Sequence, residues 1–178
     1  TKCSGIFHEL LKIQNMNGQK PSVKIPIKKL NASSVACAET AAKEFRKKLD
    51  LGNDPVASIT GMLENYCIHV IEIDANEKFD GISAYASDNK NNIIAAVVTR
   101  KNIAGERQRL NLIHEIGHLV LNPGPGVGEE KAAFRFASAF LAHTDMIYKE
   151  IGSHRSFITA EELFILKRTF GMSIQAIL

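Results

Sequence analysis

Two histidines and a glutamate stand in the order His114-Glu115-x-x-His118, in the middle of a long apolar stretch. Four residues are about one helical turn, so on a helix both imidazoles share a face and can reach one ion, about 2 Å from each nitrogen. Glu115 is turned by about 100° from His114, which places it to hold a water beside that ion. The pattern predicts a divalent metal site with an adjacent acid–base residue.

Residues 105–122 are the expected helix that carries this pattern. The stretch is apolar almost all the way round, which is typical of a buried helix. One stripe at steps of three or four residues is polar, and it contains Arg107, Asn111, His114, His118 and Asn122. A polar stripe on a buried helix needs a polar group in front of it, and two imidazoles in that stripe indicate a metal ion. The His-Glu-x-x-His order is the one that zinc peptidases use.

A third ligand is needed, because a catalytic zinc usually takes three protein ligands and a water. The sequence has Gly124 where a metzincin would place its third histidine, so that class is excluded. Pro123 ends the first helix, and a second helix is expected over residues 129–142. Glu129 and Glu130 both lie near its start, and both lie on apolar faces, so periodicity leaves the choice between them open.

Two segments of the chain together carry a resemblance to a known family. They are Arg107-x-Arg109-x-x-Leu112-x-His114-Glu115-x-Gly117-His118 and Glu130-x-x-Ala133-x-x-Phe136-Ala137-x-x-Phe140-Leu141. These segments resemble the ImmA/IrrE family, bacterial and phage metallopeptidases that cleave or inactivate helix-turn-helix repressors. Weaker similarity extends from about Ala38 to the end of the chain. The resemblance implies that Glu130 is the third metal ligand and that the ion is Zn²⁺, with Mn²⁺ or Fe²⁺ as alternatives that suit the same ligands.

The chain departs from the family pattern at two places beside the predicted site. Phe134 occupies the position of a usually polar residue, four after the metal-binding glutamate. Ala142-His143 replaces the usual Met-Pro after the leucine pair. The three predicted ligands are intact, whereas a polar side chain beside them has been replaced by an aromatic one.

Catalysis at such a site needs Glu115 as general base and a further group that stabilises the developing oxyanion. The sequence offers five polar side chains for this role or for supporting the ligands, and it does not choose among them. They are Tyr85, Arg107, Asn111, Tyr148 and His143. On a continuous helix His143 would lie roughly 220° from the face of Glu130, which argues against it.

The expected fold is α+β, a minimal zincin-like scaffold in which a small, mainly antiparallel three-stranded sheet packs with several helices. Alternation and turn residues predict strands at 67–73, 81–87 and 93–99, with 88–92 as a hairpin-type loop. Helices are expected at 4–17, 34–49, 56–65, 105–122, 129–142, 144–151 and from 160 to about 170. Residues 19–32 are expected to form an extended linker or an edge strand.

The three strands are expected to have different places in the sheet. Residues 93–99 are continuously apolar, which is typical of a central strand covered on both faces. Residues 81–87 alternate between apolar and polar, and we expect them to form an edge that pairs with an extended substrate. Residues 1–33 are interpreted as an N-terminal helix and linker, and residues 34–178 as a metallopeptidase-like domain.

Composition excludes several classes of protein. A net charge of +3 is too small to argue for nucleic-acid binding by this segment, and no run of 18 apolar residues could span a membrane. Three cysteines without a Cys-x-x-Cys pair suit a reducing cytoplasm. The family resemblance implies a bacterial or phage origin. The chain begins at Thr1 rather than Met, which allows a DNA-binding module to precede it in a longer protein.

The predicted site residues indicate a zinc-dependent endopeptidase. The family resemblance implies that its protein substrate is a helix-turn-helix repressor of the XRE type, cleaved in a stress response or in the induction of a mobile element. A second hypothesis is a non-cleaving regulatory domain of a larger transcriptional regulator, whose metal site senses or scaffolds. Chelator-sensitive fragments of a repressor would favour the enzyme, and binding without fragments would favour the regulator.

Overall fold

A computed structural model describes residues 25–87, 93–154 and 156–178, and the expected helix at 4–17 and loop at 88–92 lie outside these ranges. Three strands form the main sheet, β2 (Ile68–Ile73), β3 (Gly81–Ser87) and β4 (Ile93–Arg100), in the order β2-β4-β3. β4 pairs in parallel with β2 and antiparallel with β3. The prediction that the continuously apolar strand is central is confirmed, and so is the prediction that residues 81–87 form an edge.

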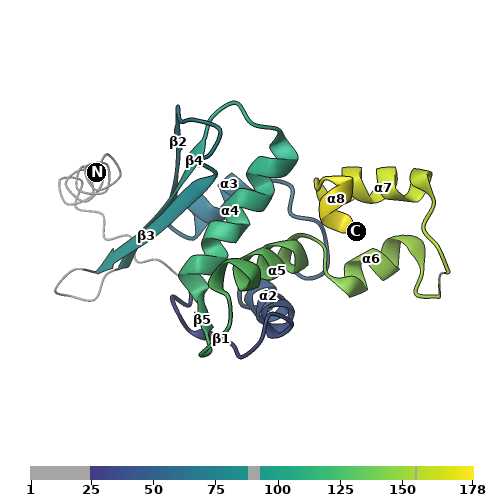
Figure 1. Cartoon of the computed structure of the whole chain (residues 1–178), viewed down its shortest axis with the longest axis horizontal. Coiled ribbons are helices and arrows are strands. Elements are labelled where there is room, and N and C mark those ends of the chain that lie inside the picture. The colour runs from purple at the N-terminus through teal and green to yellow at the C-terminus, as the bar shows by residue number, and fades with distance from the viewer. Residues whose placement is uncertain (1–24, 88–92, 155) are drawn as a thin grey trace.

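The helices follow the apolar periodicity closely. They are α2 (Cys37–Lys48), α3 (Ile59–Asn65), α4 (Gly105–Val120), α5 (Glu129–Leu141), α6 (Thr144–Ile151), α7 (Ala160–Phe170) and α8 (Ile174–Ile177). With the small sheet they confirm the α+β class (Figure 1). A capping box begins α7, since the Thr159 side chain accepts from the Glu162 backbone N–H and the Glu162 carboxylate accepts from the Thr159 backbone N–H.

The prediction that the metal-bearing helix runs to residue 122 is wrong at its last turn. α4 ends at Val120, and the next three residues form a short strand, β5 (Leu121–Pro123). β5 pairs in parallel with β1 (Leu30–Ala32), which lies in the segment expected to be a linker or an edge strand. Leu30, Ala32 and Leu121 are all buried, so this pairing, which joins segments about 90 residues apart, sets the end of the helix.

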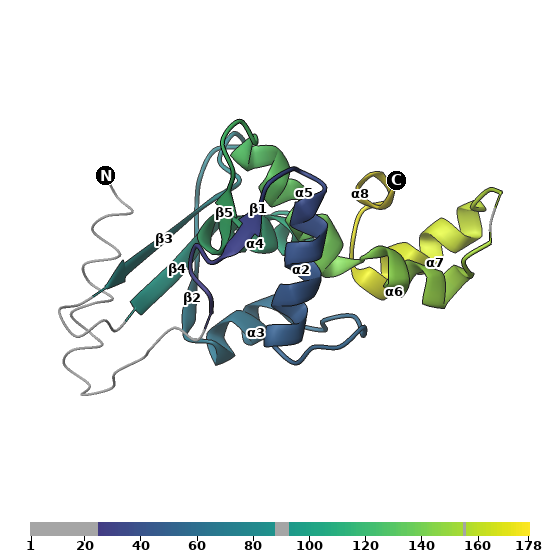
Figure 2. The same ribbon diagram turned by 90° about the horizontal axis from the view of Figure 1, so that it is seen from below.

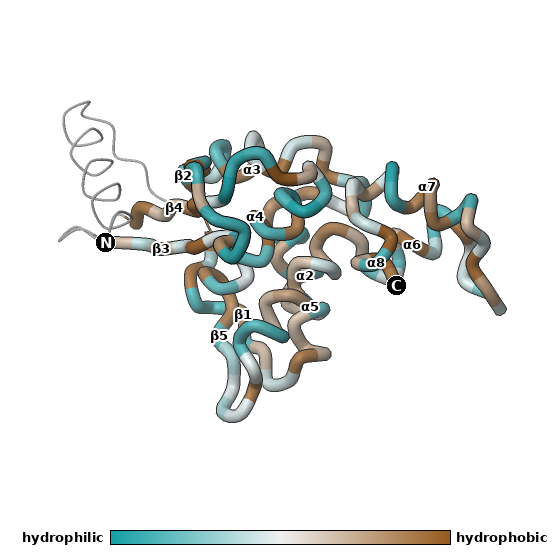
Figure 3. Tube along the Cα trace, turned by 45° about the horizontal axis from the view of Figure 1, so that its top comes forward, coloured by the Kyte–Doolittle hydropathy of each residue, from teal (hydrophilic) through white to brown (hydrophobic). Residues whose placement is uncertain are grey.

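α5 packs against both α2 and α4, and these three helices supply about half of the buried core residues. α4 and α5 approach closely, because a Cβ at Gly117 would lie only 3.1 Å from the Cα of Ala133. On the other side of α5, Phe136 and Phe140 each have their rings 5.7 Å from the ring of Phe45 of α2. Figure 3 accordingly shows the hydrophobic colour along much of α5. This tight packing fixes α5 relative to α4.

Two arginines, the buried Arg46 and the half-buried Arg109, connect the helices to the surrounding loops. Arg46 of α2 is 2% exposed and donates to the backbone carbonyls of Gly52, Asp54 and Phe140 at 3.0, 2.6 and 2.8 Å. Arg109 of α4 donates to the carbonyls of Val56, Ala57 and Phe170. Each guanidinium therefore satisfies carbonyls that helix ends and loops would otherwise leave unpaired.

The last three helices extend away from the sheet. Figures 1 and 2 both place β3 at one end of the molecule and α7 at the other. The predicted helix stop at Gly152 and the predicted stop at Gly171 are confirmed, and both glycines have positive φ, 85° and 60°. Within the described ranges, no helix combines the length and the apolar character that crossing a membrane requires.

Candidate metal centre

α4 and α5 bring three donor groups together at one end of their contact. The Nε2 atoms of His114 and His118 are 3.1 Å apart. Glu130, in the first turn of α5, lies with Oε2 at 3.2 Å from His114 Nε2 and Oε1 at 3.2 Å from His118 Nε2. The loop of residues 124–128 turns the chain back so that the start of α5 faces the last two turns of α4.

This geometry fits a divalent cation. Donors held about 2.0–2.1 Å from a tetrahedral ion are separated by about 3.3 Å, close to all three distances observed here. Two imidazole nitrogens and one carboxylate form a donor set that zinc takes in peptidases, with a fourth position open. These three residues could therefore hold one ion. Glu129, the alternative that periodicity left open, is not in this group.

The electrostatics of the histidines suit ligation. His114 is 8% exposed, and burial, followed by the nearby His118, lowers its pKa, while Glu130 opposes that effect. A lowered pKa favours the neutral imidazole, which is the form that binds a metal. Exposure rises across the site, with 10%, 23% and 73% of the side chain accessible for His114, His118 and Glu130. Glu130 thus forms the outer side of the site.

Glu115 lies beside the three donors but faces β3. A Cβ at Gly81 would be 3.1 Å from Glu115 Oε1, and the Ser83 hydroxyl donates to the Glu115 backbone carbonyl at 3.0 Å. Burial raises the pKa of the Glu115 carboxyl, and a hydrogen bond with Ser83 partly offsets this. A carboxylate with a raised pKa is a stronger base than a free one, which suits the role predicted for Glu115.

Arg107 and Asn111 have structural partners in this arrangement. The Arg107 guanidinium donates to the Asp80 carboxylate at 2.6 Å, and the Asn111 amide donates to the Asp80 backbone carbonyl at 3.2 Å. Both bonds join the first half of α4 to the residue that precedes β3. They hold the strand against the helix, and so they place Gly81 and Ser83 next to Glu115.

The three remaining candidates lie in different places. Tyr85 shares one face of β3 with Gly81 and Ser83, by the alternation of strand side chains, and is 47% exposed. Tyr148 lies on α6, at the far end of α5 from the donors. His143 follows the last turn of α5, and thirteen residues of helix span roughly 20 Å from Glu130. The structure therefore brings neither Tyr148 nor His143 to the donor group.

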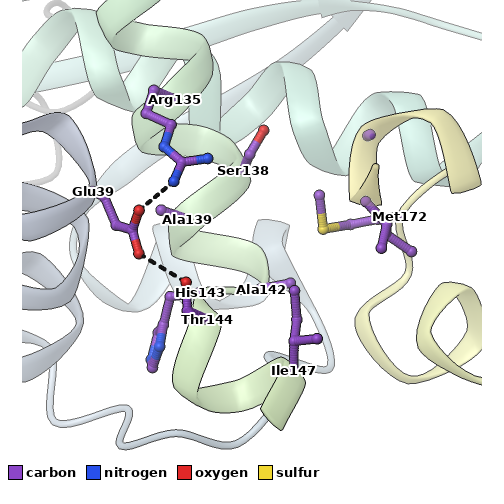
Figure 4. Close-up of a pocket in the computed structure, with 11 residues that line it drawn as sticks. Glu39, Arg135, Ser138, Ala139, Ala142, His143, Thr144, Ile147 and Met172 are labelled. Carbon is purple, nitrogen blue, oxygen red and sulfur yellow. Dashed lines mark hydrogen bonds and ion pairs between the residues drawn. The ribbon is translucent and has the colours of Figure 1, made fainter. Parts of the chain in front are cut away.

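His143 instead borders a separate cavity of about 200 Å³ between α2, α5, α6 and α8. Figure 4 shows Glu39 of α2 between Arg135 and Thr144, to which it is joined by an ion pair and a hydrogen bond, with His143 nearby. The His143 Nδ1 lies 3.5 Å from the Asp145 carboxylate. Burial is the main cause of the lowered pKa of His143.

Sequence reasoning missed the parts played by Gly81 and Phe134. Gly81 and Asp80 lie in the region from about Ala38 onward that shows the weaker similarity to the family, and that similarity was the available signal. Phe134 was noted as a departure from the family, but its contact was not foreseen. Its ring lies 4.1 Å from the His114 ring, centroid to centroid.

A broad cleft of about 890 Å³ adjoins the donor group. It is lined by residues 33–35 and 125–131, which include Glu130. The cleft is open to solvent on the same side as the exposed Glu130 carboxylate. Of the three donor residues, Glu130 is the one that lines this cleft.

Comparison with known protein families gives a match over residues 64–178, to the family described as the IrrE N-terminal-like domain, Peptidase_M78. The match covers well over half of the chain and contains His114, Glu115, His118 and Glu130. A comparison with curated proteins found no match. The chain therefore belongs to the IrrE N-terminal-like family of peptidases, as the resemblance in the sequence predicted.

Proposed function

We propose that this chain is a zinc-dependent endopeptidase that cleaves a helix-turn-helix repressor of the XRE type in the cytoplasm, in a stress response or in mobile-element induction. The observation that carries the peptidase part is the triangle of His114, His118 and Glu130 donor atoms with Glu115 beside it. Family membership supports the same reaction class. The repressor as substrate is inferred from the family resemblance.

His114, His118 and Glu130 would hold the zinc ion. When bound, zinc acts as a Lewis acid that polarises a carbonyl and makes water acidic enough to lose a proton near neutral pH. Glu115 accepts that proton and later passes it to the leaving amine. Its burial against Gly81 and Ser83 supports this role, because a buried carboxylate holds a proton more strongly than an exposed one.

β3 supplies the surface on which we place the substrate. It is an edge of the sheet, it is bonded to α4 through Ser83, and its Tyr85 lies half exposed on the face that carries Gly81. An extended peptide that pairs with this edge would present its backbone beside Glu115. Tyr85 is then the side chain we favour for stabilising the oxyanion, because it shares that face.

The test uses purified protein loaded with zinc and the repressor encoded next to it in the genome. The wild type should produce repressor fragments, and a chelator should abolish them. Glu115→Gln should keep one zinc per chain and lose about 10²–10⁴-fold in cleavage rate, which is the usual contribution of a general base. His118→Ala should lose the zinc itself.

The competing hypothesis is a non-cleaving regulatory domain, and the same mixture separates the two. Retention of the repressor by the wild type without any fragments would support the regulator and overturn the peptidase. Normal cleavage by Glu115→Gln would leave metal binding intact and refute the assignment of Glu115 as general base.

A further inference from the structure

The packing around His114 differs from what metal-binding histidines usually have. A ligating imidazole normally donates its second N–H to a carboxylate, a backbone carbonyl or a water, and that partner fixes the ring. His114 Nε2 faces Glu130 and His118, so its second nitrogen is Nδ1. In the described part of the chain, His114 Nδ1 is fully buried and has no hydrogen-bond partner.

An aromatic ring packs on the same imidazole. Phe134 is one helical turn beyond Glu130 on α5, and its ring packs on His114 at 4.1 Å with a tilt of 46°. Phe134 is 49% exposed, whereas Phe136 and Phe140 of the same helix are fully buried. Its position is therefore not explained by the core. The His118 ring contacts His114 edge-on at 4.7 Å, so His114 is enclosed by two rings.

We propose that Phe134 is a positioning residue for His114, which holds the ligand ring by packing in place of a hydrogen bond to Nδ1, and that the site consequently binds zinc more weakly than a site with an acceptor there. The inference rests on the proposed metal site and adds a determinant of its affinity. Its support is the unpaired Nδ1 of His114, the adjacent Phe134 ring and the helix face that Phe134 shares with Glu130.

The proposal predicts the direction of change for each kind of side chain at position 134. Phe134→Asn supplies a neutral acceptor and should tighten zinc binding, about tenfold, since such partners change affinity by about 10–100-fold. Phe134→Asp adds a charge to the acceptor and should tighten it at least as much. Phe134→Ala removes the packing and should weaken binding about fivefold, the cost of ordering a freed side chain. Phe134→Leu keeps an apolar contact and should stay near wild type.

The experiment measures the dissociation constant for Zn²⁺ by competition with a chromophoric chelator, in the full chain and its four variants. Phe164→Asp is the matched control, because Phe164 is a similarly exposed phenylalanine on α7 and the change in charge is the same. It should bind zinc like the wild type. In the Asp and Asn variants, ring-proton NMR of His114 should also show the Nδ1–H signal shifted downfield by the new hydrogen bond.

The outcomes separate this inference from the proposed function. Tighter binding by the Asn variant together with weaker binding by the Ala variant supports the positioning role. A wild type that binds zinc through His118, with equal dissociation constants across the series at position 134, overturns the role of Phe134 alone. A wild type that does not bind zinc overturns both this inference and the metal site on which it rests.

Discussion

The carboxylate of Glu115 lies directly against the backbone of Gly81, where a side chain would leave it no room. A Cβ at position 81 would be 3.1 Å from both Cγ and Oε1 of Glu115 and 3.3 Å from the carbonyl oxygen of Val98. The backbone of Gly81, the first residue of β3, thus limits the space available to the carboxylate of Glu115, the predicted general base. The hydrogen bonds from Arg107 and Asn111 to Asp80 hold Gly81, the next residue, in this position.

Gly81→Ala should therefore reduce cleavage without removing the metal. The new methyl group forces the Glu115 carboxylate to move by a few tenths of an ångström. Because displacement of a catalytic group by about 1 Å can cost about 100-fold in rate, we expect a smaller loss, roughly severalfold. His114, His118 and Glu130 do not contact position 81, so zinc affinity should be unchanged. Steady-state cleavage of the repressor and chelator competition measure the two quantities.

Gly105→Ala is the matched control for this variant. Gly105 is the first residue of α4, and an added Cβ there meets nothing within 4 Å. Both its cleavage rate and its zinc affinity should equal those of the wild type. If Gly81→Ala also cleaved at the wild-type rate, the space beside Glu115 would not matter for the reaction.

Local sequence patterns predicted most of this site, because its main constraint is local. His114 and His118 meet since they are one turn apart on one helix, and that spacing can be read directly. The choice of Glu130 over Glu129 could not be derived from periodicity, since it depends on how the loop 124–128 orients α5. The family resemblance supplied it.

The errors in the predicted fold come from contacts between distant segments. The end of α4 was placed too late, because Leu121 pairs with Leu30, and no local pattern reveals that pairing. In the same way, Tyr148 looks suitable by residue type, and so does His143, although helix arithmetic already argued against His143. The length and direction of α5 place both residues far from Glu130. That length and direction depend on the packing of α5 against α2 and α4.

The close contact between α4 and α5 should couple stability to metal affinity. Gly117→Ala would place a Cβ 3.1 Å from the Cα of Ala133, so one helix must move. Such overpacking typically costs about 1–3 kcal/mol, more than the gain of up to about 1 kcal/mol in helix propensity. Because Gly117 precedes His118 and Ala133 follows Glu130 by three residues, the movement should also weaken zinc binding about tenfold, since ligands need placement to within about 0.5 Å.

Urea unfolding and chelator competition check the two effects, with Gly105→Ala on the same helix as reference. The prediction would be wrong if the Gly117→Ala protein were more stable than the wild type and bound zinc equally well. That result would mean that a methyl group fits between α4 and α5 without moving either helix.

His143 should make the fold sensitive to acid. Burial is the largest cause of its lowered pKa, followed by Lys43, while Asp145 opposes these effects. A histidine whose pKa is lower in the folded state binds fewer protons folded than unfolded, so it contributes stability above the unfolded pKa that is lost as the pH falls. His143→Asn cannot titrate, so its free energy of unfolding should fall less than that of the wild type between pH 7.5 and 5.0.

Urea unfolding of the metal-free proteins at the two pH values measures this difference. His154→Asn removes an exposed imidazole in the same part of the chain and should retain the wild-type pH dependence. If the free energy of unfolding fell equally for the wild type and His143→Asn between the two pH values, His143 would not account for the acid sensitivity.

The free edge of β3 offers a test of substrate placement that carries its own control. Along an edge strand, backbone N–H groups point alternately toward the neighbouring strand and toward solvent. Of the adjacent residues Ala84 and Tyr85, one donates toward β4 and the other toward the free edge. Proline removes the N–H, so Ala84→Pro and Tyr85→Pro each delete one of the two. Tyr85→Phe is measured beside them, because it shows separately what the loss of the Tyr85 hydroxyl costs.

The variant that alters the free edge should keep its stability and its zinc affinity but lose repressor cleavage by about tenfold or more, because a peptide paired there loses a backbone hydrogen bond and its alignment. The variant that faces β4 should unfold at lower urea concentration, since a bond within the sheet is gone. Circular dichroism during urea titration identifies which variant is which. Wild-type cleavage by the stable variant would mean that the substrate does not extend the sheet at β3.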